Sequence, residues 1–217
     1  MNNSLFASVL QLSRRDCQAL RLTDPYSVHR VVYSLFPDVR STEEKQVSEA
    51  SGIQFADLGG DATGRKVLLL SDRPPAMCVA GQYGQVQTRT IPEGFLDHRL
   101  YRFKLIINPT RRDNTSKKLL AVRGRDAIAD WFMARAEASW GFSVDPQQLQ
   151  VEQVNVLRFQ DKAQRDITLA QAHLTGVLSV ADPVLFRDSF ASGIGRGRAF
   201  GCGLMQIVPL TQFISSH

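Results

Sequence analysis

The sequence contains few cysteines and histidines and no sign of a bound cofactor. Its three cysteines, Cys17, Cys78 and Cys202, lie far apart and form no CxxC pair, so we expect neither a disulfide framework nor a thiolate metal site. The four histidines are equally scattered, and no combination has the spacing of zinc ligands. The sequence therefore predicts no metal and no small-molecule cofactor.

Long apolar runs are also absent. The longest, such as residues 67–70 and 105–107, are far too short to span a bilayer. The first residues lack the basic start and long apolar stretch of a secretory signal. These absences argue against a membrane partner and predict a soluble, cytoplasmic protein.

Charge, by contrast, is concentrated in one part of the chain. Residues 1–100 carry 11 Lys and Arg against 11 Asp and Glu, whereas residues 101–217 carry 15 against 10. Between residues 102 and 125, one acid (Asp113) faces eight cations, which are Arg102, Lys104, Arg111, Arg112, Lys117, Lys118, Arg123 and Arg125. Such a cluster suits a polyanion such as nucleic acid, although a solvated surface strip explains it equally well.

The apolar pattern predicts the same order of elements twice. In the first half we expect strands at residues 5–12, 53–58, 66–71, 85–90 and 99–108, a helix from Pro25 to about Leu35, and a polar connector at 38–50. In the second half we expect strands at 118–122, 149–159, 167–180 and 204–208, and helices at 126–140 and from Pro183 to Gly193. This order predicts an α+β protein of two tandem ferredoxin-like (RRM-like) domains, residues 1–112 and 113–217. The fold alone indicates no function.

A glycine-rich segment after the last expected helix is the strongest local signal. Glycines 193, 195, 197, 201 and 203 alternate with Arg196 and Arg198. Glycine lets the backbone approach a phosphate closely, and arginine neutralises its charge. The segment is neither a P-loop nor a dinucleotide fingerprint. A helix cap followed by a tight turn is the alternative, which explains Gly193 and at most one more glycine.

The first expected helix carries a second candidate site. Tyr26, His29, Arg30 and Tyr33 recur at three- and four-residue steps and should share one face, opposite the valines. A histidine that titrates near neutral pH can take or give a proton in catalysis. The alternative is a polar histidine on an ordinary amphipathic helix. His98 and His173 lie in strands without such neighbours, and we expect them to be structural.

Four segments resemble the CasE (Cse3) family of CRISPR RNA endoribonucleases from type I-E Cascade systems. They occur in family order and are residues 24–37 (DPYSVHR to LFP), 101–109 (YRFKLIINP), the helix around 129–131 (ADW), and 193–204 (GIGRGRAFGCGL) running into Pro209 and Leu210. The resemblance implies two ferredoxin-like domains and metal-independent cleavage at the 3′ base of the CRISPR repeat stem-loop. It further implies that the ribose 2′-hydroxyl attacks the phosphate and leaves a 2′,3′-cyclic phosphate. In the family that this chain resembles, the enzyme is then expected to stay on the hairpin beside other Cascade subunits.

The resemblance also assigns residues. It makes His29 catalytic, with Tyr26 as a further candidate. The RNA-binding candidates are Arg30, Arg102, Lys104, Arg111, Arg112, Lys117, Lys118, Arg123, Arg158, Lys162, Arg165, Gly193, Gly195, Arg196, Gly197 and Arg198. Some family members carry a lysine one turn after the histidine, where this chain has Ser34. If the reaction needs a cation there, Arg30 or a residue of the second half must supply it.

Two other functions remain open at this point. A subunit that binds the CRISPR RNA hairpin without cutting it needs the same basic residues. A general RRM-like single-strand binder needs stacking aromatics on an exposed sheet face. The clearest strand, 99–108, turns its aromatics toward the core, so we rank this last.

Overall fold

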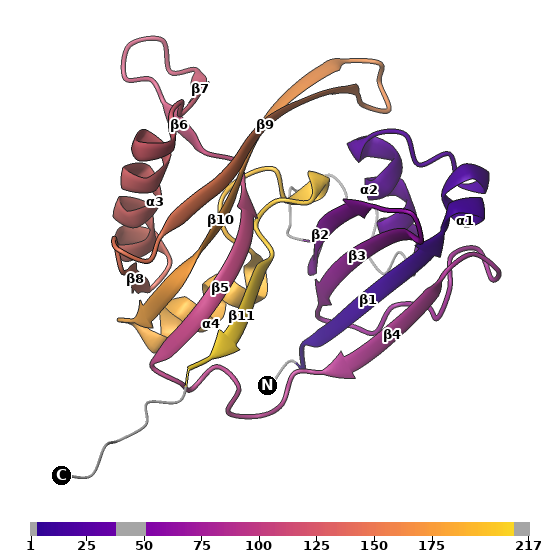
Figure 1. The fold of residues 1–217 in the computed structure, drawn as a ribbon, viewed down its shortest axis with the longest axis horizontal. Helices are drawn as coiled ribbons and strands as arrows, with labels where there is room; N and C mark the ends of the chain where they lie inside the picture. Colours follow the sequence, from indigo (N-terminus) through magenta and orange to yellow (C-terminus); the bar gives the residue numbers. More distant parts are fainter. Residues whose placement is uncertain (1–3, 38–50, 211–217) are drawn as a thin grey trace, which may run out of the picture.

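The computed structural model describes residues 4–37 and 51–210 and consists of two antiparallel sheets with their helices (Figure 1). The expected connector at 38–50 lies outside the described residues. The elements of the first half are β1 (Phe6–Ser13), α1 (Arg14–Ala19), α2 (Pro25–Ser34), β2 (Ile53–Gly60), β3 (Gly64–Ser71) and β4 (Gln85–Thr90). Then follow β5 (Leu100–Ile107), β6 (Thr110–Arg112), β7 (Leu119–Ala121), α3 (Arg125–Ser139), β8 (Phe142–Val144), β9 (Gln150–Gln160), β10 (Asp166–Val180), α4 (Pro183–Ser192), the 3-10 turn η1 (Arg198–Phe200) and β11 (Met205–Pro209).

Both sheets have the strand order of a ferredoxin-like domain. The first sheet has the order β2-β3-β1-β4, and the second has the order β11-β5-β10-β8, with β9 also paired to β10. In the first sheet β1 lies between β3 and β4, in the second β5 lies between β10 and β11, and all pairs are antiparallel. The predicted α+β fold of two ferredoxin-like domains is therefore confirmed.

The division between the domains differs from the expected one. β5 pairs with β10 and β11, so the change of sheet falls within residues 91–99 and not between 112 and 113. The sequence pattern of β5 shows which face is buried but not which strands lie beside it, since these come much later in the chain, at residues 166–180 and 205–209. We propose residues 91–99 as the domain boundary.

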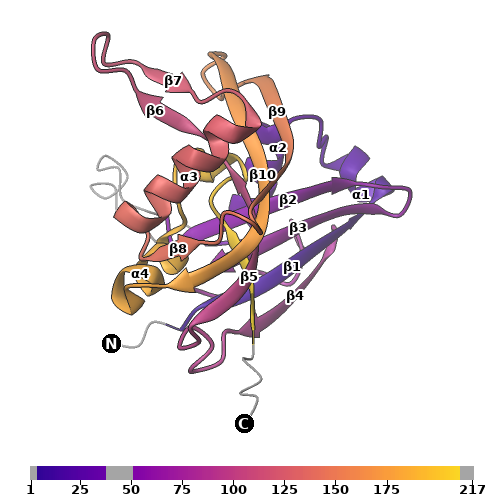
Figure 2. The same cartoon turned by 60° about the vertical axis from the view of Figure 1, so that its left-hand side comes forward.

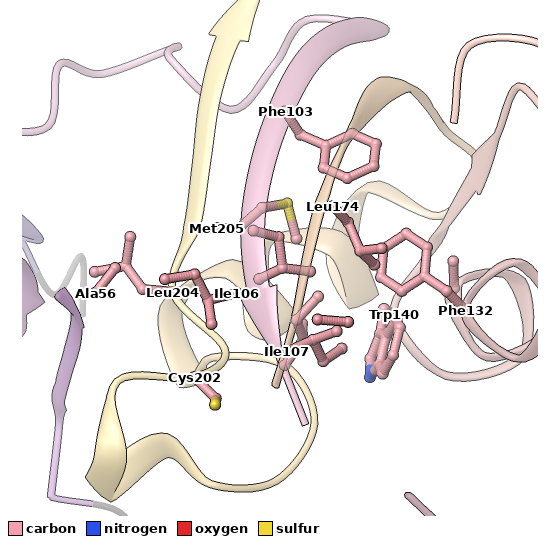
Figure 3. Packing of buried hydrophobic residues seen from close by; sticks show 14 of the residues in the cluster. Ala56, Phe103, Ile106, Ile107, Phe132, Trp140, Leu174, Cys202, Leu204 and Met205 are labelled. Atoms are coloured by element: carbon pink, nitrogen blue, oxygen red, sulfur yellow. The ribbon is translucent and has the colours of Figure 1, made fainter. Parts of the chain in front are cut away.

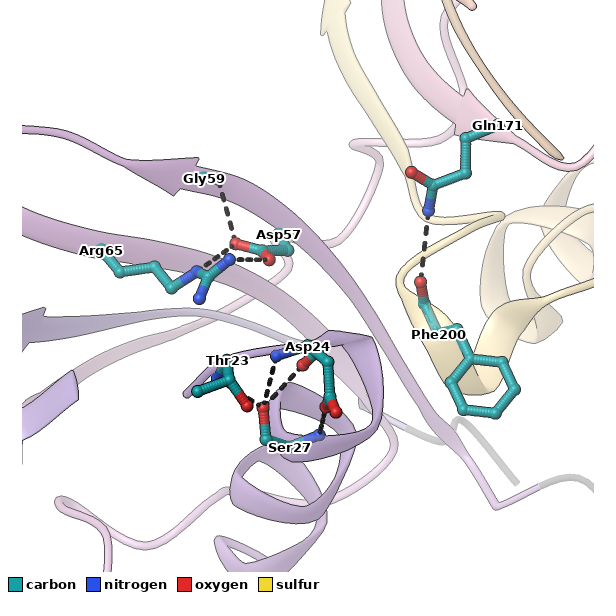
Figure 4. Close-up of polar contacts among 8 residues, drawn as sticks. All are labelled: Thr23, Asp24, Ser27, Asp57, Gly59, Arg65, Gln171 and Phe200. Carbon is teal, nitrogen blue, oxygen red and sulfur yellow. Dashed lines mark hydrogen bonds and ion pairs between the residues drawn. The ribbon is translucent and has the colours of Figure 1, made fainter. Parts of the chain in front are cut away.

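Helix α2 begins where its capping residues dictate. The Asp24 carboxylate accepts a hydrogen bond from the Ser27 N–H at 2.7 Å, and the Asp24 N–H donates to Ser27 Oγ at 3.0 Å (Figure 4). Pro25 occupies the first helical position, where it has no hydrogen bond to lose. Val28, Val31 and Val32 are buried against the first sheet, so the opposite face of α2 is free for other contacts.

Two clusters of buried apolar side chains form the cores of the domains. The first packs α2 on its sheet. In the second, aromatic residues of β5 and helices α3 and α4 pack together; Figure 3 shows Phe103, Phe132 and Trp140 in this cluster. Ala56 of β2 and Leu70 of β3 belong to the second cluster, so the first sheet also packs against the second domain. Buried Gln54 of β2 adds hydrogen bonds from Nε2 to the carbonyls of Phe190 and Ala191, at 3.0 and 2.7 Å.

Two hairpins project from the second domain. The short β6–β7 hairpin stands above α3, while the long β9–β10 hairpin extends across toward α2 (Figures 1 and 2). The sequence pattern did not predict α1, β6, β8 or η1, which have three to six residues each.

Candidate functional site

His29 lies where the two domains meet. Its Nδ1 is 2.9 Å from the carbonyl oxygen of Ala199 in η1. The imidazole ring centroid is 4.2 Å from that of Tyr33, 6.0 Å from that of Tyr26 and 5.9 Å from that of Phe200. Tyr26 and Tyr33 come from the same face of α2, as the helical spacing predicted. Phe200 comes from the glycine-rich loop, 171 residues after His29.

A cavity of about 450 Å³ brings together three segments that are far apart in the sequence. Helix α2 contributes Tyr26 and His29, and η1 contributes Ala199 and Phe200. The tip of the β9–β10 hairpin contributes Asp161, Lys162, Ala163 and Arg165. On its other side, His29 lines a larger cleft of about 1770 Å³ between the domains, together with Gln54, Tyr33 and loop residues 195–200.

Burial decides the charge of His29. Loss of solvent lowers the pKa of the imidazole below its ordinary value, and the hydrogen bond to Ala199 opposes this effect only in part. His29 is therefore neutral at pH 7. A neutral imidazole that lines a cavity can accept a proton from a hydroxyl group.

The two cations of the hairpin tip differ in whether another side chain holds them. Asp161 binds Arg165 through an ion pair at 2.6 Å and a second contact at 2.8 Å, and the hydrogen bonds from Arg165 lower the pKa of Asp161. Lys162 has no ion pair or hydrogen bond with any residue in the described part of the chain. The tip therefore offers one restrained guanidinium and one unrestrained ammonium group beside His29.

The glycines of the loop have a structural explanation that the sequence did not give. All five, from Gly193 to Gly203, have φ between 73° and 90°, where side chains are strained. Gly197 and Gly201 are left-handed residues that flank η1 on either side. A cap and tight turns thus require all five, so the glycines do not by themselves indicate a phosphate cradle.

The two loop arginines lie in the larger cleft. Arg198 Nη1 donates to the carbonyl of Ser192 at 2.6 Å, which braces the loop. Arg196 is exposed and forms an isolated β-bridge with Asn108 at the end of β5. Both line the cleft between the domains, together with Gly195 and Gly197, whereas Gly193 does not.

The other basic candidates lie elsewhere. Arg30 is exposed, and its Nη2 donates to the carbonyl of Leu20 at 3.4 Å; it lines neither cavity, although it belongs to α2. Ser34 is exposed and bonds the Val31 carbonyl. Arg102 and Lys104 project from the open face of β5. The remaining candidates are exposed around the two projecting hairpins, and they are Arg111, Arg112, Lys117, Lys118, Arg123 and Arg158.

Two contributors to the site were absent from our candidates, and a third was given no role. Tyr33 packs against His29 with its ring tilted by 40°, and helical spacing had placed it on the same face without assigning it a function. Phe200 and the Ala199 carbonyl had no such signal, because a backbone carbonyl has no sequence signature. Their position follows from the packing of the loop, where the carbonyl of Phe200 accepts a hydrogen bond from Gln171 at 3.4 Å (Figure 4).

Groups suited to other chemistry are few. Burial raises the pKa of the Cys202 thiol to about 12, so this cysteine is a protonated core residue. Within residues 4–37 and 51–210, no three His, Cys, Asp or Glu side chains are grouped to hold a metal ion. In the same ranges, no helix has the length and apolarity to cross a membrane.

One comparison with known proteins identifies a family for this chain. A family model described as "CRISPR associated protein" matches residues 5–209. A search of curated protein sequences finds no significant match.

Three solved structures share the fold. A CRISPR endoribonuclease Cse3 bound to a 19-nucleotide RNA is 21% identical, with a TM-score of 0.78 over 95% of this chain and 100% of that one. Thermus thermophilus Cse3, bound to an RNA representing a pre-cleavage complex, is 20% identical, with a TM-score of 0.76 over 95% of this chain and 100% of that one. A chain of a CRISPR RNA-guided surveillance complex is 19% identical, with a TM-score of 0.66 over 94% of this chain and 100% of that one.

Proposed function

This chain belongs to the family of CRISPR-associated proteins, and on that premise we propose that it is an endoribonuclease that processes CRISPR RNA. Its substrate is the stem-loop of the CRISPR repeat, which it cuts at the 3′ base of the hairpin without a metal ion. The observation that carries this proposal is the meeting of neutral His29 with Lys162 and Arg165 in one cavity. A base and two cations beside each other suit phosphodiester cleavage by an internal hydroxyl.

The proposed reaction is a transfer within the RNA. His29 accepts the proton of the ribose 2′-hydroxyl while the 2′ oxygen bonds to the adjacent phosphorus. The bond from phosphorus to the 5′ oxygen breaks, and this oxygen takes up a proton. The products are a 2′,3′-cyclic phosphate and a 5′-hydroxyl end.

The cations stabilise the charge that develops on the phosphate. We propose Lys162 for this role, since it lines the cavity with His29 and has no partner among the described residues. Lys162 would then supply the positive charge that some family members place one helical turn after the histidine, where this chain has Ser34. The Tyr26 hydroxyl, in the same cavity, is a further candidate for a hydrogen bond to the reacting groups.

Binding of the RNA stem involves the two hairpins and the open sheet face. The exposed cations there include Arg111, Arg112, Lys117 and Lys118 on β6–β7 and Arg158 on β9. Phosphate contacts of this kind make the affinity depend strongly on salt. After cleavage the protein remains on the hairpin as a subunit of Cascade, a role supported by its similarity to a chain of a surveillance complex.

Cleavage in the presence of EDTA, with mapping of the product ends, tests the proposal. We expect His29→Ala to slow single-turnover cleavage by roughly 100-fold or more, the range of general base catalysis. His173→Ala is the matched control, because His173 is also half-buried with a lowered pKa but lines neither cavity. One 2′-deoxy nucleotide before the cut should stop cleavage and leave binding intact.

A hairpin-binding subunit that does not cut is the second candidate, which the exposed basic hairpins support equally well. Intact repeat RNA after prolonged incubation with the wild-type protein would favour it and exclude the enzyme. A single-strand binder has less support, because none of the exposed large apolar side chains in the described ranges is aromatic.

A further inference from the structure

The ring of His29 is held on one side by a backbone carbonyl of the other domain. Its Nδ1 is 2.9 Å from the Ala199 oxygen, which is hydrogen-bond distance. Tyr33 and Phe200 pack against the ring, with centroids 4.2 and 5.9 Å away. These contacts restrict how the ring can turn about its bond to the helix.

The carbonyl also decides where the proton of the imidazole lies. A neutral imidazole has one N–H group and one nitrogen with a lone pair, and a carbonyl oxygen can only accept. The N–H must therefore be on Nδ1, and the lone pair must be on Nε2. The lowered pKa of His29 makes this neutral form the relevant one near pH 7.

The glycine-rich loop is shaped to present this carbonyl. Residues 198–200 form a 3-10 turn, and left-handed Gly197 and Gly201 bend the chain sharply on both sides of it. A Cβ on Gly201 would lie 3.2 Å from the ring of Phe55 in β2. The loop is further tied by the bond from Arg198 to the Ser192 carbonyl.

We propose that the glycine-rich loop is a positioning element of the reaction, which acts through the Ala199 carbonyl to hold His29 as its Nδ1–H tautomer. The inference rests on the proposed function in one respect, that the Nε2 lone pair takes the proton of the 2′-hydroxyl. Partners of this kind fix the tautomer of histidines in metal sites and catalytic sites. The loop therefore has a role in the chemistry beside any contact with the RNA backbone.

Nitrogen NMR of the full chain without RNA tests the tautomer directly. In protein labelled with ¹⁵N-histidine, long-range correlations between ring protons and nitrogens distinguish a protonated nitrogen from one with a lone pair. His29→Gln identifies the signals of His29. We expect a protonated Nδ1 and an unprotonated Nε2 near pH 7; a proton on Nε2 would overturn the inference.

A variant of the loop tests whether the rate follows the tautomer. Gly201→Ala strains a left-handed residue next to η1, and Gly81→Ala imposes a similar strain (φ +75°) at an exposed turn with open space around it. We expect Gly201→Ala to populate both tautomers and to lower the cleavage constant at saturating protein on the order of tenfold. Its RNA affinity should stay within about twofold, and Gly81→Ala should match the wild type in both measurements.

The two measurements separate this inference from the function that it deepens. Two results for Gly201→Ala would contradict the positioning role. One is a lower cleavage rate with His29 still in the Nδ1–H form, and the other is an unchanged cleavage rate with both tautomers populated. If Gly201→Ala does not fold, the wild-type spectrum still decides the tautomer. If the wild-type protein cuts no repeat RNA, the proposed function fails, whatever the spectrum shows.

Discussion

The two projecting hairpins of the second domain both carry cations but differ in charge density and in reach. The β6–β7 hairpin has strands of three residues and carries Arg111, Arg112, Lys117 and Lys118, none of which lines a cavity. The β9–β10 hairpin has strands of 11 and 15 residues, and its tip lines the cavity with His29. At a rise of about 3.3 Å per residue, an 11-residue strand spans roughly 35 Å, enough to cross from one domain to the other.

On the proposed function, we infer from this difference that the short hairpin contributes to RNA affinity alone. Charge density favours a polyanion at both hairpins, but only a long hairpin can bring a cation to a residue of the other domain. The denser cluster in the sequence, at residues 102–125, is therefore not the one that meets the histidine. We expect the short hairpin to contribute to RNA binding and the long one to contribute also to the reaction.

Of the two hairpins, the larger effect should come from the tip of the long one. Lys162→Ala removes the unrestrained cation of the cavity, and we expect cleavage at saturating protein to slow by about 100-fold, the lower end of the range for losing one transition-state donor. Lys118→Ala, in the short hairpin, should lower affinity and not this rate. Single-turnover cleavage over a range of protein concentrations measures both, and equal effects of the two changes on the saturated rate would abolish the distinction.

A smaller effect should come from the short hairpin. We expect the double change Arg111→Glu and Arg112→Glu to weaken hairpin RNA binding by about tenfold at moderate salt and to reduce the slope of log affinity against log salt by about 2, one for each lost phosphate contact. Titrations at several salt concentrations measure this, with circular dichroism as the control for folding. Unchanged binding would mean that the strip is only a solvated surface.

The smallest effect concerns pH. His29 must be neutral to accept a proton, so cleavage should slow as the pH falls through its pKa and level off above it. Burial lowers that pKa, so the midpoint should lie below the ordinary value of about 6.5. Cleavage rates at subsaturating protein across pH measure it. The Arg112→Glu protein should share the wild-type midpoint, and a displaced midpoint would indicate that the short hairpin also acts at the active site.

Local patterns in the sequence were sufficient for most of the fold. Asp24-Pro25 and Asp182-Pro183 predicted two helix starts, and alternation predicted strand β5, because these depend on neighbouring residues only. The expected domain boundary grouped β5 with the first domain, whereas β5 pairs with β10 and β11, partners that are chosen by packing over long separations. The short elements, such as β8, are too brief for a periodic pattern to identify.

The site was less predictable than the fold. Helical spacing placed Tyr26, His29 and Tyr33 on one face, and the structure brings them together. The pairing of α2 with the hairpin tip and with Phe200 depends on how the domains pack, which no local pattern reports. The glycines were noticed for their composition, but the reason for all five became visible only in their backbone angles.

The bond between His29 and Ala199 joins residues 170 positions apart, and this has a consequence for synthesis on the ribosome. A growing chain has its histidine early, but the carbonyl that orients the ring and the lysine that faces it emerge much later. A partly made protein therefore displays an incomplete site. The complete site forms only after both domains have been synthesised and have folded together, so RNA near the ribosome does not meet it earlier.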